Sequence, residues 1–362
     1  MYRAAVLRAV HEEFPEIAKW ADWCYGQHSH LLLGGTLLSS ESGVQQGDPL
    51  GPFLFSLCIQ GAIEHAMAAT KSAFPGGLDA VYFYLDDGCV CGNARAVAAF
   101  VQLLTSQLAS RGLAVSPSKC ELIPAAGRAS TAENVSLFFP PGCKLHLDRN
   151  FDLLGAPIGD EGFCNRHTEE RVEKAVDLMN KIVEAGDCQV SLLLLRQCAA
   201  FCKLSYLCRV VPPSLHLGQL GAMDCGVRTS FNELSGFAPD DTSWSLAQRS
   251  VKAGGLGLRS AEEHSSAAYV SSRVACDELC AKLDPNYNKQ GQGDELFQST
   301  LDTLRRQLPA SVSQLDMFDT SAKQKELSAF VDEAALKTLC ESRTIPLCLK
   351  AHLSLVGQPG AG

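Results

Sequence analysis

The sequence AVYFYLDDGCVCG, residues 80–92, decides the fold. Aromatic and β-branched residues lead to two adjacent aspartates, and a second short apolar run then ends at Gly92. This pattern predicts a tight β-hairpin with Asp86 and Asp87 at its tip. Neighbouring carboxylates stay ionised together only where water or a cation compensates their charges. On these residues alone a metal ligand and a solvated turn are both open, because aspartate also favours turns.

Length and composition limit the class of protein. The chain has 362 residues, of which 46% are hydrophobic, so it can bury a sizeable core in two or three units. The formal net charge of −9 argues against a strongly nucleic-acid-coated surface but allows a local basic groove. No continuous apolar run reaches about 18 residues and no signal-peptide core is visible, so we expect an intracellular protein, cytoplasmic or nuclear, without a membrane partner. The sixteen cysteines form no zinc pattern, and we expect reduced core thiols at Cys58, Cys198, Cys202 and Cys208.

A segment rich in glycine and proline, GVQQGDPLGP at residues 43–52, precedes a long apolar segment. Its backbone should be open to close approach by a ligand, and a helix should start near Asp48 and Pro49. The apolar residues that follow predict a buried helix of about twenty residues, apolar on nearly every side and packed under the sheet that carries the hairpin. Before this segment, the pattern predicts helices over 2–13 and 17–25 and a hairpin over 31–43.

Residues 42–57, SGVQQGDPLGPFLFSL, followed by YLDD at 84–87, resemble the palm of a reverse transcriptase of the non-LTR retroelement kind. In that family the first stretch is motif B and the second is motif C, in this order and with one helix and one strand between them. GLAVSPSKCELI at 112–123 resembles motif D, although Ser116 stands where the family more often has Asn. FDLLGAPIG at 151–159 resembles the motif E strand pair, which is the primer grip.

The resemblance implies nucleotidyl transfer by two Mg²⁺ ions, with Mn²⁺ as an alternative, between a DNA primer and an incoming nucleotide on an RNA template. Asp86 would be the metal ligand of motif C, and Asp87 would be its partner. Lys119, at the basic position of motif D, would act near the leaving phosphates as a positive charge or a proton donor. By itself, a lysine on a loop is usually only solvated.

The resemblance also implies positions for the substrates. Gln46 and Gly47 would line the template and incoming-base pocket, Gly47 because any side chain would fill the space. Tyr84 would pack beside the primer end, while an ordinary strand aromatic is an equally open interpretation. Leu154 and Gly155 would belong to the primer grip.

Other parts of the family pattern are not found in this sequence. The family's palm begins with a motif A strand whose aspartate bridges both metals, and basic fingers precede it. Residues 3–26 resemble the helical segment after motif A, and neither Asp22 nor Asp79 substitutes for the missing acid. We therefore expect a palm truncated before motif A and a catalytically incomplete chain. The alternatives are a non-catalytic retroelement relic, which at most binds nucleic acid or a protein partner, and a fragment of an inaccurate gene model.

The predicted fold class is α+β, with an antiparallel sheet centred on the YLDD hairpin. We expect a truncated palm over 1–160, a helical thumb-like region over 161–235 and a helical C-terminal extension over 236–362. Within the thumb-like region, apolar spacing predicts helices over 165–184, capped by Asn or Thr, and 190–211. The oligomeric state stays open.

Overall fold

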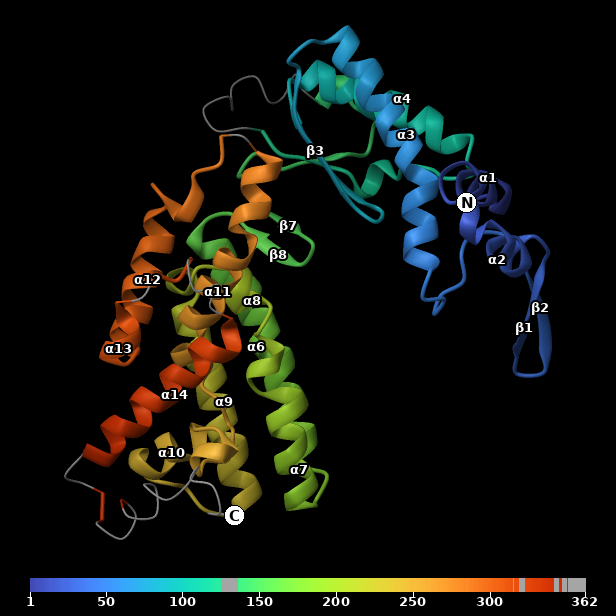
Figure 1. Ribbon diagram of the computed structural model, residues 1–362. Coiled ribbons are helices and arrows are strands. Elements are labelled where there is room, and N and C mark those ends of the chain that lie inside the picture. The colour runs from blue at the N-terminus through green and yellow to red at the C-terminus, as the bar shows by residue number, and fades with distance from the viewer. Residues whose placement is uncertain are drawn as a thin grey trace. The chain divides into compact units, whose positions relative to one another are not determined.

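The computed structural model describes residues 1–124, 136–284, 286–314, 316–318, 323–341, 345–346 and 350. The chain divides into two compact units, Met1–Arg149 and Asn150–Gly362 (Figure 1). Helices predominate, and the strands of the described residues form small two-stranded sheets. The predicted α+β class is confirmed, whereas the predicted division into three domains stays a prediction.

The first unit opens with a helix pair and a hairpin. Helix α1 (Arg3–Glu13) ends before Pro15, whose fixed φ suits the start of α2 (Pro15–Tyr25). Strands β1 (Ser29–Leu33) and β2 (Thr36–Ser40) pair antiparallel around a two-residue glycine turn. These elements agree with the sequence pattern, although β2 ends at Ser40 and not near residue 43.

Helix α3 (Gly51–Ala73) connects two hydrophobic clusters of the first unit. Its first half, with Leu54 and Cys58, packs against α1 and α2. Its second half packs with buried residues of α4 (Ala94–Ala109) and with the inner face of the YLDD hairpin. The predicted helix of about twenty residues is present and packs against the hairpin, but the prediction that it is buried is right for one side only, because its buried residues form a stripe at helical spacing while other apolar side chains stay partly exposed.

The YLDD hairpin consists of β3 (Leu78–Tyr84) and β4 (Asp87–Gly92). One face carries Val81, Phe83 and Val90, which pack against the α3 and α4 cluster. Among the described residues this sheet has only two strands. The rest of the described first unit contains the short elements η1 (Pro117–Lys119), β5 (Glu121–Leu122), η3 (Ser136–Phe138) and β6 (Lys144–Leu145), with β5 and β6 parallel.

The second unit is mainly helical. Its elements are β7 (Phe151–Leu153), β8 (Ala156–Ile158), α6 (Glu161–Val183), α7 (Cys188–Leu194), the π-helical η4 (Leu195–Ala199), η5 (Phe201–Lys203), α8 (Leu207–Val210), η6 (Pro213–Leu215), α9 (Leu217–Ser235), α10 (Asp241–Gln248), η7 (Val251–Ala253), α11 (Ala261–Leu283), η8 (Lys289–Gly291), α12 (Glu295–Gln307), α13 (Ala310–Ser313) and α14 (Gln324–Glu341). One cluster centres on α6, α9 and the start of α11, and a second joins α11, α12 and α14.

Two helix predictions for this unit need correction. Helix α6 starts at Glu161, because the Asp160 carboxylate accepts the Phe163 N–H and caps it. The helix predicted over 190–211 is interrupted, because Ala200 leaves helical geometry after the π-helical turn. The π-helical turn shifts the helical phase, so the apolar pattern no longer marks a single buried face. The expectation of core thiols is confirmed for Cys58 in α3 and Cys208 in α8, and it is wrong for Cys198 and Cys202, which lie at the interruption and are exposed.

Two segments of the described residues are long and apolar enough to cross a membrane, α3 and the segment Cys188–Val210. The expectation based on continuous apolar runs missed them. This is weak evidence for a membrane, because the core helix of a soluble protein meets the same criteria. The absence of a membrane partner therefore stays a prediction.

Candidate functional site

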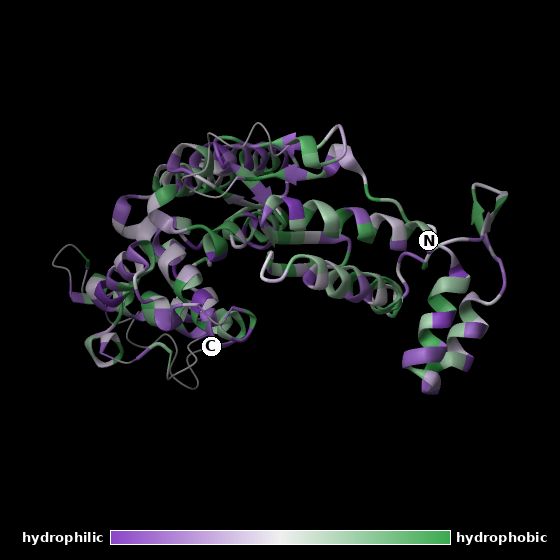
Figure 2. Ribbon diagram, turned by 90° about the horizontal axis from the view of Figure 1, so that it is seen from above, coloured by the Kyte–Doolittle hydropathy of each residue, from purple (hydrophilic) through white to green (hydrophobic). Residues whose placement is uncertain are grey.

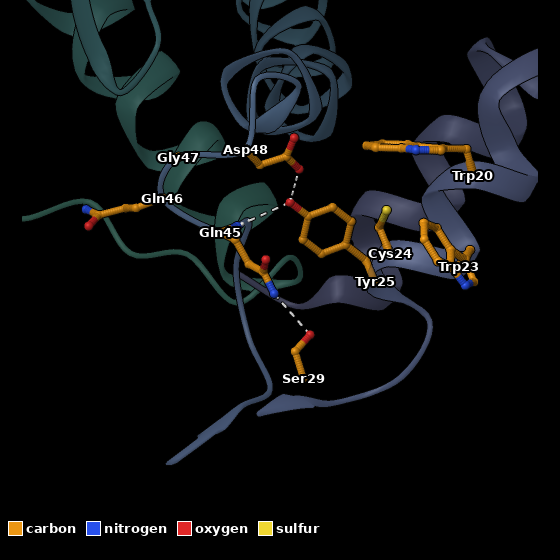
Figure 3. A pocket seen from close by; sticks show the side chains of 9 residues that line it. All are labelled: Trp20, Trp23, Cys24, Tyr25, Ser29, Gln45, Gln46, Gly47 and Asp48. Carbon is orange, nitrogen blue, oxygen red and sulfur yellow. Dashed lines mark hydrogen bonds between the residues drawn. The ribbon is translucent and has the colours of Figure 1, made fainter. Parts of the chain in front are cut away.

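A cavity of about 590 Å³ lies beside the loop that leads into α3 (Figure 3). Its wall comes from three places: the last two turns of α2, the start of β1 and the QQGD loop. The lining residues are Trp20, Trp23, Cys24, Tyr25, Ser29, Gln45, Gln46, Gly47 and Asp48. The predicted motif B residues Gln46 and Gly47 thus lie in a cavity that they share with aromatic side chains.

Tyr25 holds the QQGD loop against α2. Its buried ring carries a hydroxyl that donates a hydrogen bond to Asp48 Oδ2 and accepts one from the Gln45 N–H. The other Asp48 oxygen accepts the Leu50 N–H at 2.9 Å, next to the start of α3. Burial, and then the Asp48 contact, raise the pKa of Tyr25 above its usual range. The hydroxyl therefore keeps its proton and remains a donor to the carboxylate.

Arg3 supports the same loop from α1. Its buried guanidinium donates to the backbone oxygens of Gly43 and Gln27, at 3.2 and 3.1 Å, and to Ser40 Oγ at 2.9 Å. It also lies over the Tyr25 ring, 5.4 Å from the centroid. One cation thus ties together the end of β2, the end of α2 and the first residue of the glycine-rich segment. Sequence reasoning missed Arg3 and Tyr25, because a lone arginine and a lone tyrosine on helices carry no motif.

Gly47 has a backbone reason to be glycine. A Cβ atom placed on Gly47 would meet no described heavy atom within 4 Å, so the space beside it is open. Its φ of +91° is instead a conformation that glycine adopts readily and other residues avoid. Gly47 is therefore needed for the turn of the loop, and the expectation that a side chain there would fill space meant for a substrate stays a prediction.

The predicted aspartates lie at the tip of the YLDD hairpin. Tyr84 pairs with Asp87, so Leu85 and Asp86 form a two-residue turn. Leu85 has a φ of 56°, which is unfavourable for a branched side chain and marks a strained position. Both aspartates are exposed, as expected, and Tyr84 is 67% exposed. Gly88, next to the pair, is needed because a Cβ there would lie 2.4 Å from the Phe83 ring.

The two carboxylates fit Mg²⁺ only in part. Their oxygens are the hard ligands that this ion prefers, and their exposure leaves them open to it. However, the part of the chain that the structure describes contains no group of three or more histidine, cysteine, aspartate or glutamate side chains placed to hold a metal ion. The described residues therefore do not complete a two-metal site.

The structure does not place these aspartates in the cavity. Neither Asp86 nor Asp87 lines it, although both features belong to the first unit. Helix α3 separates them, with the QQGD loop at its start and the hairpin packed against its second half. The lining of this cavity therefore does not bring Gln46 and Gly47 together with either aspartate.

The remaining predicted residues lie on exposed turns. Lys119 is the last residue of the short helix η1 and is exposed. Leu154 and Gly155 form the turn between β7 and β8, with φ values of 52° and 78°. The Tyr206 hydroxyl donates to Leu154 O at 2.9 Å and steadies this turn. Tyr206 is a second residue that the sequence pattern did not indicate.

Residues 11–158 match the family model of the reverse transcriptase (RNA-dependent DNA polymerase) domain. The matched segment runs from α1 to β8 and includes the cavity, the YLDD hairpin, Lys119 and the β7–β8 turn. It covers less than half of the chain, and it supports the presence of a reverse transcriptase segment there. No curated protein matches the chain.

Proposed function

We propose that this chain carries the palm of an RNA-directed DNA polymerase of the non-LTR retroelement kind. The observation that carries this proposal is the arrangement inside the matched segment: a QQGD loop braced at the start of α3, and a hairpin with paired exposed aspartates packed on the same helix. The partners are an RNA template and a DNA primer. A positively charged and aromatic surface is the usual requirement for such partners, and the aromatic part is found at the cavity.

In this proposal Asp86 and Asp87 form one wall of a Mg²⁺ site, and Mn²⁺ could take the same place. The ions would supply charge neutralisation at the reacting phosphates. Gln46, Gly47 and Tyr84 would position template, nucleotide and primer end. Lys119 would carry positive charge near the leaving phosphates, and Leu154 and Gly155 would hold the primer strand.

We further propose that the 362-residue chain by itself does not extend a primer. Two carboxylates on one hairpin hold Mg²⁺ weakly, and two-metal catalysis needs both ions held together. The alternative function is nucleic-acid binding without catalysis. It is favoured by the finding that the described residues contain no group of three potential metal ligands.

We also propose an intracellular location, which fits the free thiols of every cysteine that the structure describes.

Primer extension on an RNA template tests these proposals. The purified chain is compared with the double variant Asp86→Ala, Asp87→Ala and with the matched control Asp79→Ala, which removes an exposed acid elsewhere on β3. We expect the same background from all three in Mg²⁺ and in Mn²⁺. Extension by the parent and the control that the double variant abolishes would refute the proposed inactivity.

Binding of a labelled RNA–DNA template–primer hybrid tests the polymerase origin separately from catalysis. We expect measurable binding by the parent chain. Failure to bind the hybrid at tens of micromolar protein, with the chain folded by circular dichroism, would contradict the proposed palm.

A further inference from the structure

We propose that the cavity beside the QQGD loop binds an unpaired base of single-stranded RNA, with Trp20 and Trp23 as the stacking residues. This inference rests on the proposed function, because it names the part of the substrate that this cavity takes. It also separates two occupants that the resemblance leaves together, the template base and the incoming nucleoside triphosphate.

The aromatic side chains supply the first part of the argument. Trp20 and Trp23 lie three residues apart on α2, so they project from neighbouring positions on one face of the helix. Trp23 is 83% exposed, which is unusual for so large an apolar ring, and Trp20 is 37% exposed, so part of its ring is open as well. In the view of Figure 3, the Trp20 ring lies at the level of Asp48 and above Tyr25, and Trp23 lies next to Cys24. An open indole face is a surface on which any nucleobase can stack.

The charges of the wall supply the second part. None of the nine described lining residues is lysine, arginine or histidine. Arg3 lies nearby, but its guanidinium is buried and is engaged by the backbone and Ser40. A triphosphate is usually bound by cationic side chains that compensate its charge, and none is among the described lining residues. The cavity therefore suits the flat, uncharged part of a nucleotide.

The polar groups of the wall supply the third part. Asp48 is the one carboxylate among the lining residues, and its oxygens already accept hydrogen bonds from Tyr25 and Leu50. Gln45 is fixed by a hydrogen bond from its Nε2 to Ser29 Oγ at 3.0 Å. Gln46 is exposed, and its amide offers a donor and an acceptor. The Gln46 amide can therefore pair with the edge of a base, which is free only in a single strand.

The test uses the full chain with Trp244→Phe, because the sequence has three tryptophans and this change leaves Trp20 and Trp23 as the only indole reporters. The probe is a fluorescein-labelled 12-nucleotide single-stranded RNA without self-complementarity. Its affinity is measured by anisotropy, and indole quenching is measured with the unlabelled RNA. The variants are Trp23→Ala, Trp23→Phe, and the double change Trp20→Ala, Trp23→Ala. The matched control is Phe237→Ala, which removes an exposed aromatic ring of the second unit.

We expect RNA to quench the indole fluorescence and the double change to weaken RNA binding by about tenfold or more, which is the size of one lost stacking contact. Trp23→Phe should lose less than Trp23→Ala, and Phe237→Ala should bind as the parent does. The affinity should fall only slightly with added salt, because few phosphates are contacted.

Three results would overturn the inference: no RNA binding by the parent, unchanged binding by the double variant, or dATP binding at least as tight as RNA. None of these results depends on primer extension. Failure here therefore leaves the polymerase proposal standing, and a failed polymerase proposal leaves the binding result interpretable.

Discussion

Replacing Leu54 by alanine tests which face of α3 forms the core. Leu54 has no exposed surface and packs in the cluster with Val6 and Val10 of α1 and Cys58 of α3. The change removes three carbon atoms, each worth about 0.8 kcal/mol of transfer free energy, and leaves a cavity among helices that cannot fully collapse. We expect a loss of about 2 to 5 kcal/mol in the free energy of unfolding of the first unit.

The matched control is Leu57→Ala, one turn further along the same helix. Leu57 is only partly buried, so its loss should be less than half as large. Urea unfolding of both variants is followed by indole fluorescence in the Trp244→Phe chain, because Trp20 and Trp23 then report on the first unit alone. The slope of the free energy with urea must stay constant for the comparison to hold. A Leu54→Ala loss under about 1 kcal/mol, or one no larger than that of Leu57→Ala, would refute this account of the core.

Three further predictions concern other parts of the chain. Tyr25→Phe removes the hydroxyl that Asp48 and Gln45 share, and it should cost about 1 to 3 kcal/mol in urea unfolding of the first unit, whereas Tyr84→Phe, at an exposed ring, should cost almost nothing. Burial lowers the pKa of His216 from 6.5 to about 4, so in this pH range the unfolded chain binds a proton that the folded chain does not. The free energy of unfolding should therefore fall by up to about 3 kcal/mol as the pH drops from 6.5 to 4. His216→Asn should flatten that acid loss, and an unchanged pH profile would contradict the assignment. Leu32 is 75% exposed on the β1–β2 hairpin, which Figure 2 shows as hydrophobic, so Leu32→Lys should leave the unfolding free energy within about 0.5 kcal/mol and reduce light scattering at high concentration.

The buried site of His216 fits one tautomer of its neutral imidazole. The Thr168 hydroxyl donates its only proton to Cys164 O at 2.9 Å, so it can only accept from His216 Nδ1, 3.0 Å away. The neutral imidazole with its proton on Nδ1 therefore fits the buried site. An asparagine amide can make the same donation, which is why Asn is the chosen replacement.

Local features of this chain could be predicted from the sequence. The strands around Asp86 and Asp87 follow from alternation between an inner and an outer face, and the turn lies between paired residues that are three apart. The break at Pro15 and the β1–β2 turn could also be predicted, because proline fixes its own φ angle and glycine allows a positive one. The QQGD loop could be located for the same reason.

Which side of an apolar segment is buried could not be predicted in this way. The composition of α3 is apolar on nearly every side, and only its neighbours α1, α2 and α4 decide that Leu54 is buried while Leu57 is partly exposed. The interruption at Ala200 is similar, because the residues from 190 to 211 keep a helical pattern through the π-helical turn. Packing against α9 and α11 decides where this segment is interrupted, because the packing energy exceeds the small differences in helix propensity.

The sequence alone determined the two chemical signals of this protein, the QQGD loop and the paired aspartates, because each is a short run whose residue types act through their own backbone and charge. The tertiary structure decided what surrounds them. Arg3, Trp20, Trp23 and Tyr25 come to the QQGD loop only when α1 and α2 pack on α3, and the aspartates lie outside that cavity. A site made of side chains that are distant in sequence depends on the packing of helices, and packing depends on shape and burial over the whole unit.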